Sequence, residues 1–149
     1  MRVLHCLSAV LCAFLVPLAL LAIKGMENPY GALAKEGEKI GQEYYLCSRS
    51  SQAEIRSSVS ILETGMITGE KAVFAFETEK EAYRCAMKLL DEQGARVVLE
   101  ENISGAYSIY AHTRKRAGGV CLLGETVNLH IVLSGKIVQV GMPLIFGGY

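Results

Sequence analysis

The sequence predicts an α+β fold in which a mainly antiparallel β-sheet carries two helices on one face. One strong amphipathic helix lies between two groups of strand-like runs, and the strands follow one another without the helical crossovers that parallel sheets need. The chain has 149 residues, of which 51% are hydrophobic and 20% charged, and this composition suits one packed domain. We expect that domain to cover residues 26–149.

Residues 1–25 form a separate apolar segment. The run Val3–Ile23 contains no charged side chain, and one basic residue stands at each end of it. Because about 20 apolar residues span a bilayer as a helix, we expect an N-terminal apolar helix that is either a cleaved signal peptide or a retained membrane anchor. The best cleavage position, after Ala22, has Leu20 where a small residue is preferred, so both interpretations stay open. Either one places the domain outside the cytoplasm.

The first helix of the domain is expected to begin at Asn28, because Asn is a good N-cap and Pro29 suits the first helical position. Residues at helical spacing follow, namely Tyr30, Leu33, Gly37 and Ile40. Gly41 can then end the helix in the left-handed conformation. Extended runs rich in β-branched and aromatic residues come next, over residues 44–48, 55–62 and 72–76.

The second helix has the clearest signal. Thr78 and Glu81 match a capping box, in which each side chain accepts a hydrogen bond from the other residue's backbone N–H. An apolar stripe follows, made of Ala82, Ala86, Leu89 and Leu90. Gly94 is placed to end the helix. We expect this stripe to pack on the sheet.

After Gly94 the pattern is one of strands. Strands are expected over residues 96–100 and 107–112, followed by a basic loop over 114–119. The last two strands form a hairpin if Ser134-Gly135 is its two-residue turn.

This turn would set the register of the hairpin. It would pair Leu133 with Lys136, Ile131 with Val138, Leu129 with Val140, Val127 with Met142, His130 with Gln139, and Asn128 with Gly141. One face of the hairpin is then almost wholly apolar, and a one-residue slip would mix the two faces. Pro143 has no N–H to donate, so we expect it at a strand end.

Charge and motifs exclude several classes of function. Without the two basic residues that flank the apolar run, 13 basic residues remain against 15 acidic ones, whereas nucleic-acid-binding domains are normally basic. The chain has no G-x-S-x-G, no P-loop spacing and no C-x-x-C pair. We therefore expect no metal, no cofactor and no nucleic-acid partner.

The domain cysteines, Cys47, Cys85 and Cys121, allow either one disulfide and one free thiol or three small, mostly buried residues.

The candidate binding residues are aromatic and histidine side chains on the expected strands. Tyr44, Tyr45, Tyr107 and Tyr110 would form an aromatic surface for sugars or peptides, unless they are ordinary strand residues. His112 and His130 would lie on the wetter face of the sheet with Tyr110. Either histidine could act with a glutamate as an acid or base, and otherwise both are plain sheet residues.

Two C-terminal segments carry a family resemblance. Val127–Val132 contains an Asn-Leu pair, and Val140–Ile145 closes on Gly-x-Pro and two apolar residues. Together with the export segment and the order of elements, they resemble the YwmB family of exported proteins of spore-forming Gram-positive bacteria. The resemblance implies a fold similar to TATA-box-binding protein, with a curved antiparallel sheet and helices on its convex side. It implies no catalytic residues.

These observations favour a non-enzymatic, extracytoplasmic or membrane-tethered binding or assembly module. Its partner would be a protein or cell-wall component of the cell envelope. The alternative is a small cell-envelope hydrolase that uses His112 or His130. A third hypothesis, nucleic-acid binding through the sheet, has the acidic charge balance against it.

Overall fold

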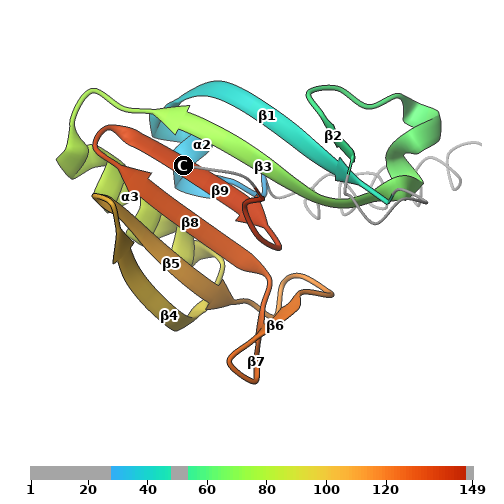
Figure 1. Cartoon of the computed structure of the whole chain (residues 1–149). Coiled ribbons are helices and arrows are strands. Elements are labelled where there is room, and N and C mark those ends of the chain that lie inside the picture. The colour runs from blue at the N-terminus through green and yellow to red at the C-terminus, as the bar shows by residue number, and fades with distance from the viewer. Residues whose placement is uncertain (1–27, 48–53, 147–149) are drawn as a thin grey trace, which may run out of the picture.

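The computed structural model describes residues 28–47 and 54–146, and these form an α+β domain built on a large antiparallel sheet (Figure 1). The helices are α2 (Gly31–Glu36), α3 (Glu79–Glu92) and the 3₁₀-helix η1 (Ile61–Met66). The strands are β1 (Glu38–Leu46), β2 (Glu54–Arg56), β3 (Ile67–Ala75), β4 (Arg96–Ile103), β5 (Ala106–His112), β6 (Val120–Leu122), β7 (Glu125–Val127), β8 (Leu129–Ser134) and β9 (Ile137–Met142).

Seven of these strands form one sheet in the order β2-β1-β3-β9-β8-β5-β4, and β6 and β7 form a separate small ribbon. All the pairings are antiparallel, as the sequence predicts. The expected apolar helix over residues 1–25 lies outside the described residues. Within the described ranges, no helix is long and apolar enough to cross a bilayer.

The main core lies between one face of the sheet and the two α-helices, which lie together behind it in Figure 1. The helices contribute Leu33, Ala82, Cys85, Ala86, Leu89 and Leu90, and the sheet contributes Ala72, Phe74, Ile109, Ala111, Leu129, Ile131, Leu133, Val138, Val140 and Met142. Alternate residues of each strand face the helices, which is the period-2 pattern of a sheet with one buried face.

The predicted second helix is confirmed. Thr78 Oγ1 accepts from the Glu81 amide at 3.2 Å, and the Glu81 carboxylate accepts from the Thr78 amide at 3.2 Å. Gly94 follows the helix with φ +55°, a conformation that favours glycine.

The predicted first helix is wrong at both ends, because its N-cap is Tyr30 rather than Asn28 and its first helical residue is Gly31 rather than Pro29. It ends at Glu36, and the segment that includes Ile40 and Gly41 is part of β1 instead. Gly37 is extended, and a Cβ on it would lie 2.6 Å from the Phe76 ring. This close approach lets the chain leave the helix and pair Glu38 with Ala75 at the end of β3.

The predicted strand over 55–62 is also wrong, because only β2 forms there. Ser60 and Glu63 make a capping box that begins η1 in place of a longer strand. Local side-chain bonds to the backbone have overridden a β-rich composition.

The C-terminal hairpin has the predicted faces but a different register. Its turn is Gly135-Lys136, which pairs Ile131 with Val140 and Leu133 with Val138. Gly135 has φ +57°, as the first central residue of a type II′ turn requires. A Ser134-Gly135 turn of type I′ would have required positive φ at a serine. Val127 pairs with Val120 in the small ribbon rather than with Met142.

The face of the sheet opposite the helices is covered in part by the chain after β9. Pro143 follows the last residue of β9, as predicted, and the Met142–Pro143 peptide bond is cis. Ile145 then packs against Val132 and Ala106. A Cβ on Gly141 would lie 2.5 Å from the Ile145 nitrogen, so glycine is needed where this segment crosses the strand.

Candidate functional site

The four candidate tyrosines do not share one face of the sheet. Tyr45 is buried, and its hydroxyl accepts a hydrogen bond from the Phe146 amide at 3.2 Å. Tyr107 lies on the helix side, where it packs against the core and hydrogen-bonds with Glu100, which raises its pKa. Tyr110 lies on the opposite side, and its hydroxyl donates to Glu101 Oε1 at 2.7 Å. Tyr44 is half-buried on β1, opposite Glu70 of β3. The structure therefore does not bring them together as one aromatic surface.

His130 is buried under the C-terminal segment and has a structural role. It is 1% exposed, and its ring stacks on that of Tyr110 at 4.1 Å between centroids. Its Nδ1 accepts a hydrogen bond from the Ile145 amide at 3.2 Å. Burial lowers the pKa of His130 to about 4, because the charged form loses its solvation. The ring is neutral at physiological pH and holds the segment on the sheet.

His112 lies half-buried at the end of β5, opposite Arg96 of β4. It is on the same face of the sheet as His130 and Tyr110, as the sequence predicts from alternation. The expectation that this face is the wetter one is wrong at His130, which the C-terminal segment covers. Among the described residues, no group of three histidine, cysteine or acidic side chains is arranged to hold a metal ion.

The cysteines Cys47, Cys85 and Cys121 are free thiols in the part of the chain that the structure describes. Cys85 is buried and donates to Glu36 Oε2 at 3.5 Å. Burial, with the neighbouring Glu36 carboxylate, raises its pKa and makes it unreactive. Cys47 and Cys121 are exposed, so the expectation of three mostly buried residues is wrong for these two.

A projecting arm carries the most exposed apolar side chains. The arm, residues 54–66, runs from the edge strand β2 to η1 at the end of the sheet away from α2 and α3 (Figure 1). Ile61 is 89% exposed and Leu62 95% exposed, and Ile55 and Met66 are also exposed. Aliphatic side chains exposed together are typical of a contact surface.

Local interactions order the arm although it buries little. Glu63 Oε2 accepts from the Ser60 hydroxyl at 2.9 Å and from the Ser60 amide at 3.2 Å. These bonds, with the Arg56 guanidinium 2.8 Å away, lower the pKa of Glu63. Arg56 also pairs with Glu54 at 2.6 Å. Ile61 and Leu62 are thus exposed to solvent on a turn that these charged and polar residues hold.

Sequence reasoning missed this arm because it assigned residues 55–62 to a strand. The pattern Ser60-Ile61-Leu62-Glu63 is itself a capping-box signature and could have identified the turn. Comparison with protein-family models, with curated proteins and with solved structures gave no match for this chain.

Proposed function

We propose that this chain is a non-enzymatic binding or assembly module on the outer side of a membrane, and that it contacts a partner protein of the cell envelope through the arm. The observation that carries this proposal is the nearly complete exposure of Ile61 and Leu62 on an ordered turn.

The location is supported by the sequence before the domain. The uncharged run Val3–Ile23 is long enough to span a bilayer, and the described domain begins at Asn28, only a few residues after it. Whether the run is retained or cleaved, an export signal of this kind directs the domain across the membrane.

The partner chemistry is supported by the composition of the arm. Burying an exposed Leu or Ile side chain against a partner contributes about 2 kcal/mol to the binding free energy. Ile61 and Leu62 together could therefore anchor a partner that has an apolar pocket. The arm also carries the ion-paired residues Glu54, Arg56 and Glu63, and charged side chains of this kind are common in the polar rim of a protein interface. The arm has no excess of basic residues that would favour a lipid surface instead.

The family proposal is that the domain is similar to the YwmB family and to the curved sheet of TATA-box-binding protein. Support comes from the antiparallel sheet with helices on one face and from Asn128, Gly141 and Pro143 of the C-terminal segments. The hydrolase alternative has less support, because His130 is buried and neutral. The acidic domain also gives little support to nucleic-acid binding.

A photo-crosslinking amino acid in place of Leu62, in cells that export the protein, tests the proposal. We expect a discrete adduct with a second protein, and we expect Ile61→Ser to abolish it without changing the melting temperature. The matched control is the same crosslinker at Leu123, which is 79% exposed in the turn between β6 and β7.

Three outcomes would contradict the proposal. An adduct with lipid would make the arm a membrane-inserting element, and an adduct with a second copy would make it a self-association surface. Equal adducts from positions 62 and 123 would show only random collision.

A further inference from the structure

Basic side chains gather in a cleft beside the C-terminal end of α3. The cleft has a volume of about 560 Å³ and is lined by Gln93, Gly94, Arg96, His112, Arg114 and Lys115. None of these lining residues is acidic, although the domain as a whole has more acidic than basic residues. The charge is therefore segregated, and the cleft is suited to an anion.

The fold brings these residues together from three elements. Arg96 begins β4 directly after the turn that ends α3, and it is the register partner of His112 at the end of β5. Arg114 and Lys115 follow in the loop after β5. Asn128 holds this loop, since its side chain accepts from the Thr113 amide at 2.8 Å and donates to the Arg116 carbonyl at 3.0 Å.

The negative end of the helix is already neutralised by other groups. Lys115 Nζ donates to the Glu92 carbonyl at 2.6 Å, and Thr113 Oγ1 donates to the Gln93 carbonyl at 2.5 Å. Amides of the following turn occupy the carbonyls of Leu90 and Asp91. The helix carbonyls therefore do not require the two arginines of the cleft.

One charged group in the cleft remains available to a ligand. Within the described ranges, the exposed Arg114 side chain has no ion-pair partner. His112 Nδ1 also lacks a hydrogen-bond partner, but it is buried and does not reach the open cleft. Arg96 pairs with Glu125 at 2.7 Å, and both side chains are more than half exposed, so this pair is weak and can be exchanged.

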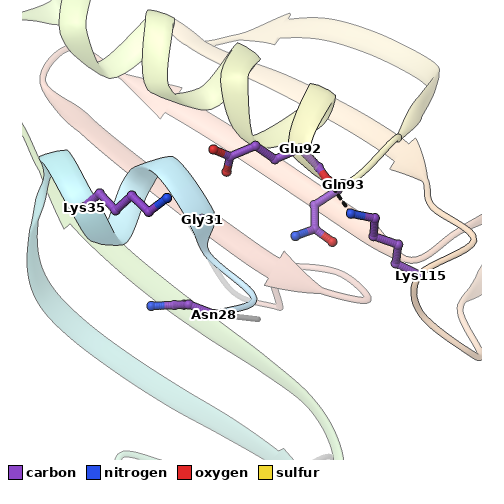
Figure 2. Close-up of a pocket in the computed structure, with 6 residues that line it drawn as sticks. All are labelled: Asn28, Gly31, Lys35, Glu92, Gln93 and Lys115. Atoms are coloured by element: carbon purple, nitrogen blue, oxygen red, sulfur yellow. Dashed lines mark hydrogen bonds between the residues drawn. The ribbon is translucent and has the colours of Figure 1, made fainter. Parts of the chain in front are cut away.

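The cleft lies near Asn28, the first residue of the domain that the structure describes. A neighbouring hollow of about 300 Å³ shares Gln93 and Lys115 with it and is lined also by Asn28, Gly31, Lys35 and Glu92 (Figure 2). Asn28 is the fifth residue after Ile23, and five residues span at most about 18 Å. A retained anchor would hold this basic end of the domain near the lipid headgroups.

We propose that this cleft binds a phosphate group, with Arg114 and Arg96 as the principal ligands and the headgroup of an anionic phospholipid as its source. Guanidinium groups recognise phosphate oxygens through paired hydrogen bonds, and basic clusters next to an anchor attract anionic lipids. Free phosphate would present the same chemistry. Only the choice of lipid as the source rests on the membrane location proposed above.

Calorimetry on the full chain in a neutral maltoside detergent tests the site. The probes are inorganic phosphate and glycerophosphoglycerol, which is the soluble headgroup of phosphatidylglycerol, with glycerol as the blank. We expect saturable binding, tighter for glycerophosphoglycerol, and about tenfold weaker binding by Arg114→Gln. The matched control Arg84→Gln removes the same charge from an exposed site on α3 and should leave the affinity unchanged.

The absence of saturable binding by either probe would overturn the phosphate site. Equal weakening by Arg84→Gln and Arg114→Gln would also overturn it, because the effect would then reflect net charge. Tighter binding of inorganic phosphate would keep the site and remove the lipid headgroup as its source. None of these results depends on the arm, so the arm proposal stands or fails separately.

Discussion

At the residue scale, His130 shows how the domain places a titratable group where only its neutral form fits. The imidazole has the C-terminal segment on one side and Tyr110 on the other, and its Nδ1 must be unprotonated to accept from the Ile145 amide. The alternation of side chains along β8 predicts on which face of the sheet His130 lies. It does not predict that the C-terminal segment covers that face, because the contact between His130 and Ile145 joins residues far apart in the sequence.

Acid should therefore destabilise the domain through His130. The folded-state pKa, about 4, lies below the ordinary value of about 6.5, so the unfolded chain binds the proton first as the pH falls. The contribution of His130 to the free energy of unfolding is fully present above pH 6.5 and falls by about 3 kcal/mol as the pH is lowered to 4. Urea unfolding at several pH values measures this slope.

His130→Asn is the matched variant, because the asparagine oxygen can accept from the Ile145 amide but does not titrate in this range. We expect it to lose the part of the slope that His130 contributes, even if it is less stable overall. An unchanged difference in stability between pH 7 and pH 4.5 would show that His130 is not the titrating group.

At the element scale, the loop after β5 is held by one side chain. Asn128 is 2% exposed and makes three hydrogen bonds, to the amide and carbonyl of Thr113 and to the carbonyl of Arg116. This loop presents Arg114 and Lys115 to the basic cleft. The asparagine of the Asn-Leu pair thus has a clear structural purpose in this chain.

Asn128→Ala should destabilise the domain by about 3 kcal/mol, because it leaves the buried amide and carbonyl of Thr113 without partners. Denaturant unfolding measures the loss. Asn102→Ala, on the exposed edge strand β4, is the control and should change stability by less than about 0.5 kcal/mol. Similar losses from both variants would mean that the bonds to the loop contribute little.

The elements that the sequence predicted well are those with complete local signals. The helix after Thr78 has a capping box, an apolar stripe and a terminal glycine, and all three are observed. The hairpin register was predicted wrongly because moving it by two residues leaves each side chain on the same face. The hydrophobic pattern therefore could not choose between the two turns.

At the scale of the whole molecule, the antiparallel sheet with helices on one face follows from the strand order and the apolar pattern. The positions of the two surfaces that we propose as functional, the arm and the basic cleft, do not follow from the strand order or the apolar pattern. The arm depends on a 3₁₀ turn that replaces a strand, and the basic cleft depends on the meeting of three elements. Tyr44, Tyr107 and Tyr110, chosen from residue type alone, are separated by the same tertiary arrangement.

The central claim, that the domain works on the outer side of a membrane, can be tested with its own exposed thiol. Cys121 lies on β6 and is exposed, whereas Cys85 is buried. In a Cys47→Ser variant, a membrane-impermeant maleimide should label Cys121 in intact cells, and Cys121→Ser should remove that label. Labelling that requires cell lysis would place the domain inside and contradict the account.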